Sequence, residues 1–127
     1  MNIWLVDDNT FYIEVLKKLL ENCTEHSVTE KMNSGEELIN AVLTPSKKNS
    51  PDLILLDLYM DKISGWEVLD TFKNNNINIP IIVVTYSDFK QDITKSASYE
   101  IVKGYFQKGD YPAALFEMIK NIEHVNN

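Results

Sequence analysis

Five polar side chains in this 127-residue sequence stand at or just beyond the ends of apolar runs. They are Asp7 and Asp8 after IWLV, Asp57 after LILL, Thr85 after IIVV, and Lys108 just after IVKGYF. The carboxyl ends of parallel strands meet at one edge of an open α/β sheet, where its functional crevice lies. If the apolar runs are strands of one such sheet, we expect these five side chains to share a site.

The chemistry of such a site follows from its charges. Two like charges ~4 Å apart repel by about 4 kcal/mol at an effective dielectric of about 20, so clustered carboxylates need a cation. Oxygen ligands with room for water suit Mg²⁺, and the lack of a nearby His or Cys argues against zinc. With the metal and Lys108 shielding incoming negative charge, one carboxylate can attack phosphorus and form an aspartyl phosphate. Thr85 can donate its hydroxyl to the phosphoryl oxygens.

The elements that position these residues are predicted from the apolar pattern. Unbroken apolar runs indicate strands buried on both faces, and apolar residues spaced three and four apart indicate helices between them. The predicted strands are residues 3–6, 27–32, 53–56, 81–84 and 101–106. Ser34 with Glu37 and Ser64 with Glu67 form capping boxes at two helix starts. The β-α alternation predicts a doubly wound α/β domain with a five-stranded parallel sheet and helices on both faces.

One predicted helix differs from the others. Residues 88–100 offer a thin apolar stripe, for which we expect Phe89, Ile93 and Ala97 to be the buried positions. The last helix has the fuller stripe of Leu115, Met118, Ile119 and Ile122. We therefore predict that the helix within residues 88–100 is weakly held, as moving parts of switches often are.

Composition narrows the function further. A net charge of −7 without any arginine argues against direct nucleic-acid binding and against binding to anionic membranes. No apolar run is long enough to cross a bilayer, and the N-terminus lacks the features of a signal peptide. We expect one domain, residues 1–127, that is soluble and cytoplasmic, with a polar surface loop over residues 44–51.

The segments VDDN, LILLDLYM, IIVVTYS and GYFQKG occur in an order and spacing that resembles the receiver domains of bacterial two-component response regulators. The likeness covers essentially the whole chain and is closest to single-domain receivers of the chemotaxis-regulator kind. It implies a flavodoxin-like sheet of strand order 2-1-3-4-5. It also implies that Asp57 accepts the phosphoryl group and that Asp8 binds Mg²⁺, or Mn²⁺ in its place, directly.

The resemblance implies roles for the remaining site residues as well. Asp7 would hold the metal mostly through water, and the backbone carbonyl of Tyr59 would complete the protein's share of the metal ligands, which includes Asp57. Thr85 and Lys108 would bind the phosphoryl group. Tyr105 matches the aromatic residue that changes rotamer together with Thr85 on activation.

The implied function is a signalling switch or relay. A histidine kinase or phosphotransfer protein would phosphorylate Asp57, and a partner would read the change at the surface of the fourth helix, fifth strand and fifth helix. Such a protein is not a turnover enzyme, since it catalyses only its own phosphorylation and dephosphorylation. An aspartate-nucleophile phosphatase would need a second acid where Tyr59 stands, and a flavodoxin-type carrier would not place carboxylates after its first strand.

Three positions depart from the usual receiver pattern. Asp61 and Gly109 stand where most receivers have proline, and Tyr86 replaces a small residue and is expected to narrow access to the site. These departures favour an alternative, a receiver-like protein-interaction module that does not depend on phosphate. Retention of all five polar residues favours the phosphorylation switch.

Overall fold

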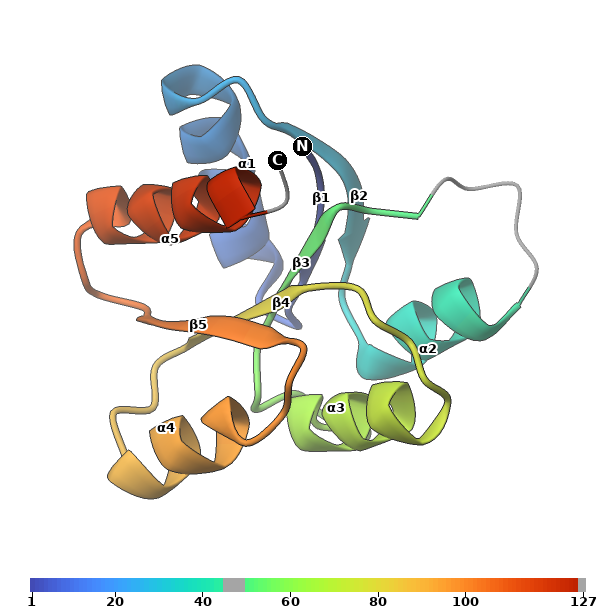
Figure 1. Ribbon diagram of the computed structural model, residues 1–127. Coiled ribbons are helices and arrows are strands. Elements are labelled where there is room, and N and C mark those ends of the chain that lie inside the picture. Colours follow the sequence, from blue (N-terminus) through green and yellow to red (C-terminus); the bar gives the residue numbers. More distant parts are fainter. Residues whose placement is uncertain (45–49, 126–127) are drawn as a thin grey trace.

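The computed structural model describes residues 1–44 and 50–125, so most of the predicted loop over residues 44–51 lies outside the described part. Strands and helices alternate along the chain: β1 Asn2–Val6, α1 Thr10–Cys23, β2 Ser27–Met32, α2 Gly35–Leu43, β3 Leu53–Leu56, α3 Gly65–Asn74, β4 Ile81–Thr85, α4 Lys90–Ala97, β5 Val102–Gln107 and α5 Pro112–Val125. The strands form one parallel sheet of order β2-β1-β3-β4-β5 (Figure 1). The predicted fold and strand order are confirmed.

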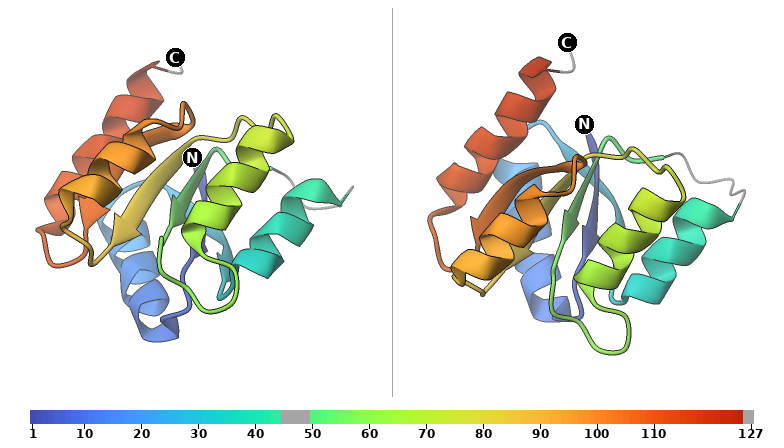
Figure 2. Two further views of the ribbon diagram at one scale, coloured as in Figure 1. Left: turned by 90° about the horizontal axis from the view of Figure 1, so that it is seen from below. Right: turned by 60° about the horizontal axis from the view of Figure 1, so that its bottom comes forward.

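The sheet is covered on both faces, which explains why its central strands are apolar without alternation. Helices α1 and α5 lie on one face, and α2, α3 and α4 lie on the other (Figures 1 and 2). Every residue of β3 and of β4 is buried. Alternate residues of a strand therefore enter two separate apolar clusters. Leu55 belongs to the same cluster as Leu16 of α1 and Ile119 of α5, and Ile54 belongs to the same cluster as Phe72 of α3.

The helix starts follow the predicted capping pattern. The side chains of Ser34 and Ser64 accept hydrogen bonds from the backbone N–H groups of Glu37 and Glu67, both at 3.2 Å. Asn9 caps α1 in the same way. These side chains satisfy N–H groups that have no partner within the helix, which stabilises each helix start by about 1 kcal/mol.

The buried face of helix α4 differs from the predicted one. Phe89 and Ile93 are 65% and 41% exposed, and Ala97 is exposed as well. The buried residues are instead Asp92 and Ser96. The expected apolar face was wrong because Asp92 accepts hydrogen bonds from the hydroxyl groups of Tyr59 and Ser87, and these contacts turn its side of the helix inward. The four-residue spacing is the same for both faces, so spacing alone does not distinguish them.

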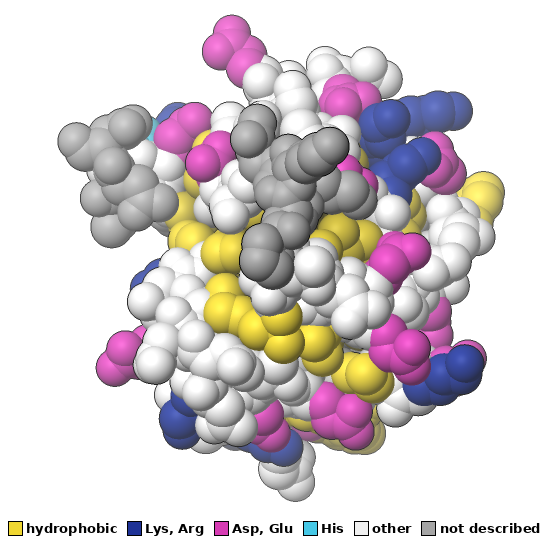
Figure 3. All heavy atoms as spheres, turned by 90° about the vertical axis from the view of Figure 1, so that its right-hand side faces the viewer, with side chains coloured by type: hydrophobic (Ala, Val, Ile, Leu, Met, Phe, Trp, Pro, Cys, Tyr) yellow, Lys and Arg dark blue, Asp and Glu magenta, His cyan; other side chains and the backbone are white. Residues whose placement is uncertain are grey.

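On the side that carries α2, Figure 3 shows a band of apolar side chains bordered by carboxylates. A hollow of about 300 Å³ on this side is lined mainly by Trp4, Val42, Ile77 and Ile79. Thr44 and Ser50 also line this hollow. No helix in the described part of the chain combines the length and the apolar character needed to span a membrane.

Two glycines that follow capping serines give a stability test. A Cβ on Gly65 would lie 2.4 Å from the Asp57 carbonyl oxygen and 2.6 Å from the Leu58 Cα, both backbone atoms. A Cβ on Gly35 would meet first the side chain of Ile63, at 2.9 Å. We expect Gly65→Ala to lower the free energy of unfolding by about 3 kcal/mol, because the backbone of Asp57 and Leu58 cannot move aside easily.

Urea denaturation of the two variants provides the measurement. Gly35→Ala is the matched control, since both substitutions add the same methyl group at the first residue of a helix. Its loss should be clearly smaller, because its closest contact is a side chain that can shift and its backbone contact, the Ile63 carbonyl oxygen, would lie at 3.0 Å rather than 2.4 Å. Equal losses in the two variants would contradict the close packing of α3 on the Asp57 loop.

Candidate functional site

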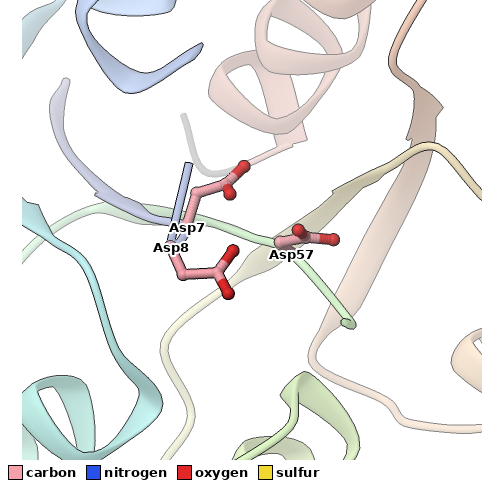
Figure 4. Close-up of side chains that lie close together, drawn as sticks. All are labelled: Asp7, Asp8 and Asp57. Atoms are coloured by element: carbon pink, nitrogen blue, oxygen red, sulfur yellow. The ribbon is translucent and has the colours of Figure 1, made fainter. Parts of the chain in front are cut away.

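The pairing of β1 with β3 brings the three carboxylates together. Val6 pairs with Leu56, and the Asp57 N–H donates to the Val6 carbonyl at 3.0 Å, so Asp7 and Asp57 follow paired positions on adjacent strands. One oxygen from each of Asp7, Asp8 and Asp57 lies within 4.8 Å of the others (Figure 4). Asp7 and Asp57 are buried and Asp8 is exposed.

Backbone N–H groups hold each of these carboxylates. Asn9 donates to Asp7 at 2.9 Å, and Tyr59 donates to Asp57 at 3.3 Å. Asp61 donates to Asp8 at 3.2 Å. Proline has no N–H, so Asp61 supplies a contact that the usual receiver residue at this position lacks. This departure therefore ties the β3–α3 loop to a candidate metal ligand.

Lys108 provides the positive charge at the site. Its Nζ lies 2.6 Å from Asp7 Oδ2 and 3.4 Å from Asp57 Oδ2, and its side chain is 2% exposed. The ammonium also lies 4.4 Å from the ring centroid of Tyr12 and 5.0 Å from that of Tyr86. Both distances are in the range of cation–π attraction. The bulky Tyr86 therefore lies over the lysine at the rim of the site, and its effect on access stays a prediction.

The loop after Lys108 differs from the usual receiver loop. The Lys108 N–H donates to the Thr85 carbonyl at 2.7 Å, and no cis peptide bond occurs within residues 1–44 and 50–125. Gly109 instead has a φ of +110°, which strongly favours glycine. A glycine with positive φ thus makes the turn where most receivers have proline.

The electrostatics of the site fit a phosphoacceptor held ready for a cation. Burial raises the pKa of Asp57, Lys108 opposes this rise, and Asp7 adds to it. Burial and the neighbouring carboxylates raise the pKa of Tyr12 to about 12, so its phenol stays neutral. Asp57 is therefore a poorly hydrated carboxylate whose charged form depends on nearby positive charge.

Thr85 of β4 and Tyr105 of β5 come from the half of the sheet on the far side of β3 from β1. Thr85 is 1% exposed, and its nearby hydroxyl lowers the pKa of Asp57. The Tyr105 hydroxyl donates to the Ser87 carbonyl at 2.8 Å, so it contacts the loop that follows Thr85. The structure thus brings the predicted site residues to one edge of the sheet. Their roles in phosphorylation stay predictions.

Three residues at the site were missed by sequence reasoning. Tyr12 was not predicted to reach the site, although its ring contacts Lys108. Ser87 and Asp92 had no assigned role, yet the Ser87 hydroxyl donates to Asp92 at 2.5 Å. No pattern in the sequence marks these residues, because their partners come from elements distant along the chain.

The donor set fits a hard divalent cation. The three clustered carboxylates offer only oxygen atoms, which suits Mg²⁺, and such an acidic triad is typical of the magnesium site of receivers. Because Lys108 is paired most closely with Asp7, Asp8 and Asp57 are the carboxylates more available to a metal. The direct role of Asp8 and the indirect role of Asp7 stay predictions.

Comparison with known proteins identifies the family. The model of the response regulator receiver domain matches residues 3–120, so the chain belongs to this family of two-component signalling proteins. Receiver domains are phosphoacceptor regulatory modules that partner with histidine kinases. They are the class of protein that this fold and this arrangement of acidic residues define.

Individual relatives support the same assignment. A nitrate/nitrite response regulator homolog of Haemophilus influenzae is 32% identical over 126 residues, covering 96% of this chain and 56% of the relative. Response regulator Rcp1 of Synechocystis is 42% identical over 76 residues, covering 58% of this chain and 50% of Rcp1. The chain therefore spans about half the length of the curated relatives it matches.

Solved structures agree with this result. The phosphorylated cyanobacterial phytochrome response regulator RcpA has a TM-score of 0.77 and 32% identity, covering 96% of this chain and 90% of RcpA. A two-component response regulator from Clostridium difficile has a TM-score of 0.84 at 24% identity, covering 100% and 98% of the two chains. The second likeness supports the fold alone.

The carboxylate cluster predicts that Mg²⁺ stabilises the protein. A ligand at about 100 times its dissociation constant adds about 2.7 kcal/mol to the free energy of unfolding. We expect millimolar Mg²⁺ to raise the melting temperature, and Asp8→Ala to remove most of that rise because the exposed metal ligand is lost. Thermal melts with and without Mg²⁺ measure both effects.

Asp110→Ala is the control for this experiment. Asp110 is exposed and lies outside the carboxylate cluster, so its loss should leave the response to Mg²⁺ intact. A melting temperature that does not respond to Mg²⁺ in the wild-type protein would contradict a metal site at these residues.

Proposed function

We propose that this receiver is a cytoplasmic phosphorylation-dependent switch or relay that accepts a phosphoryl group on Asp57. The observation that carries the proposal is the position of this buried carboxylate beside both Lys108 and the Asp7–Asp8 pair. A histidine kinase or phosphotransfer protein would be the donor. The acidic net charge of −7 supports a protein partner rather than direct contact with nucleic acid.

Each residue has a distinct part in the proposed reaction. An Asp57 Oδ attacks phosphorus, the bond between phosphorus and the donor's leaving group breaks, and an acyl phosphate forms. Lys108 balances the added negative charge, and the Thr85 hydroxyl donates to a phosphoryl oxygen. Asp8, Asp57 and the Tyr59 carbonyl would hold Mg²⁺ directly and Asp7 mostly through water, and the bound ion would neutralise charge on the transferring group.

The signal would leave through the surface of α4, β5 and α5. Thr85 ends β4 and precedes the loop into α4, and Tyr105 of β5 contacts that loop through Ser87. A phosphoryl group that repositions the Thr85 hydroxyl therefore acts on the start of α4 and on Tyr105. The exposed side chains of Phe89 and Ile93 would give a protein partner an apolar contact on this surface.

The second candidate is a receiver-like interaction module that works without phosphate. The aromatic rings of Tyr12 and Tyr86 beside Lys108 favour it, since they crowd the residue that must meet a phosphoryl group. The intact cluster of acidic residues and lysine favours the switch. Direct measurement of phosphorylation distinguishes the two candidates.

Incubation with acetyl phosphate, a small phosphoryl donor, tests the proposed function. Intact-mass analysis should show a single added phosphoryl group in the presence of Mg²⁺ and none when the metal is chelated. The same protein without acetyl phosphate serves as the control. A wild-type mass that does not change under these conditions would overturn the switch and favour the interaction module.

A further inference from the structure

Helix α4 buries a carboxylate where an apolar side chain would be expected. Asp92 is 9% exposed, whereas Phe89 and Ile93 of the same helix start are 65% and 41% exposed. Burying a charged group is unfavourable unless it is well paired. A buried polar residue is therefore more informative than an exposed apolar one, because it needs hydrogen-bond partners within the fold.

The hydrogen-bond partners of Asp92 come from two loops, the β3–α3 loop that follows Asp57 and the β4–α4 loop that follows Thr85. The Tyr59 hydroxyl donates to Asp92 Oδ2 at 2.5 Å, and the Ser87 hydroxyl donates to the same oxygen at 2.5 Å. Tyr59 stands two residues after Asp57, and Ser87 stands two residues after Thr85. We name the trio of Tyr59, Ser87 and Asp92 the hydroxyl clasp.

The hydroxyl clasp connects directly to the reacting groups. The Tyr59 N–H donates to Asp57 Oδ1 at 3.3 Å, and the Ser87 N–H lies 3.5 Å from the Thr85 hydroxyl oxygen. The Tyr105 hydroxyl contacts the Ser87 carbonyl. Tyr59 and Ser87 of the clasp thus each contact, through the backbone N–H, a residue that would meet the phosphoryl group.

The start of α4 is a suitable place for the carboxylate. Asp92 is the third residue of the helix, where the positive end of the helix dipole favours a negative charge. Its hydrogen bond also raises the pKa of the Tyr59 hydroxyl, so this group remains a donor. The clasp is therefore a charge-assisted contact that holds two loops to one helix.

We propose that Asp92 is a positioning residue for phosphorylation, which acts by holding Tyr59 and Ser87 so that the Asp57 carboxylate and the Thr85 hydroxyl face a shared phosphoryl position. The inference rests on the proposed function. Preorganised donors stabilise a charged group without having to reorient when it arrives. Loss of the clasp should therefore weaken binding of the phosphoryl group while leaving the three metal-site carboxylates in place.

Titration with beryllofluoride in excess Mg²⁺, followed by fluorine NMR, tests the inference. Asp92→Ala should bind this phosphoryl mimic about tenfold more weakly, which corresponds to about 1.4 kcal/mol. Asp92→Asn keeps an oxygen acceptor and should recover part of the affinity. Asp88→Asn removes an exposed carboxylate from the loop that leads into α4 and should match the wild-type protein.

A double-mutant cycle separates positioning from a general structural effect. Tyr59→Phe and Ser87→Ala each remove one hydroxyl donor and should weaken binding, but neither should weaken it further once Asp92 is alanine. If Asp92→Ala does not fold, Asp92→Asn and Ser87→Ala carry the same test. Affinities within twofold of wild type for all clasp variants would overturn the inference, as would fully additive losses.

The outcomes also distinguish this inference from the proposed function. If the wild-type protein binds no beryllofluoride and gains no phosphoryl group, the proposed function is wrong and the inference is wrong with it. If the wild-type protein binds beryllofluoride and the clasp variants bind equally well, only the role of Asp92 is wrong.

Discussion

Replacing Asp57 with asparagine is expected to abolish phosphoryl addition completely and, at the same time, to raise the melting temperature of the metal-free protein. An amide is not a nucleophile toward phosphorus as a carboxylate is, so no acyl phosphate forms. The stability gain has a separate cause. Burial raises the pKa of Asp57, which means that the folded protein holds the charged carboxylate less favourably than the unfolded chain does.

The sign of the stability effect follows from proton linkage. A carboxyl group whose pKa is raised in the folded state binds its proton more tightly there, so stability falls as the pH rises through that pKa. At neutral pH the wild-type protein has lost the stability that the protonated Asp57 carboxyl contributes. Asparagine removes the buried negative charge that causes this loss. We expect a rise of a few degrees in the melting temperature.

Intact-mass analysis and thermal melts check the two halves of this prediction. Asp110→Asn, an exposed substitution, should keep both phosphorylation and the wild-type melting temperature. A phosphoryl group that persists on Asp57→Asn would show that another residue is the acceptor. A lower melting temperature for this variant would contradict the unfavourable burial of the Asp57 charge.

Replacing Lys108 with methionine should have the largest effect on stability at the site. Its ammonium lies 2.6 Å from one buried carboxylate, of Asp7, and 3.4 Å from another, of Asp57. Removing one partner of a buried ion pair typically costs about 3–5 kcal/mol, because the remaining charges lose their compensation. We expect a loss near the lower end of that range without Mg²⁺, since methionine keeps the apolar stem packed.

Mg²⁺ should restore much of that stability. The metal can neutralise the carboxylates that Lys108 leaves behind, so the stabilisation by Mg²⁺ should be larger in Lys108→Met than in the wild-type protein. Urea denaturation with and without Mg²⁺ gives both values. Lys103→Met, an exposed substitution on β5, the strand that Lys108 follows, is the control and should change neither. A Lys108→Met variant as stable as wild type without Mg²⁺ would contradict the buried ion pair.

The amino-acid sequence alone determined the β-α alternation and most of the predicted site. Strands 53–56 and 27–32 coincide with β3 and β2, and the other strand boundaries lie within a residue of those observed. This succeeds because an unbroken apolar run has to be buried on both faces, and only a parallel sheet between helices provides that. The carboxyl ends of such strands meet at one edge, which places Asp57 beside Asp7 and Asp8.

The side of α4 that faces the interior was decided only by the tertiary structure. Periodicity shows which residues of a helix share a face, so both the stripe of Phe89 and Ile93 and the stripe of Asp92 and Ser96 are visible in the sequence. An apolar stripe is normally the buried one, and here it is exposed. The choice depends on hydroxyl groups of Tyr59 and Ser87, which lie on separate loops and meet Asp92 only after folding.

The surroundings of Lys108 were decided in the same way. Its place after an apolar run predicts that it reaches the site, but not that it is enclosed by the rings of Tyr12 and Tyr86. Those residues belong to α1 and to the β4–α4 loop, far from Lys108 along the chain. Local sequence determines strands, helices and their ends because these depend on near neighbours and on burial. The pairing of polar groups across the sheet depends on the assembled fold, because each partner comes from a different element.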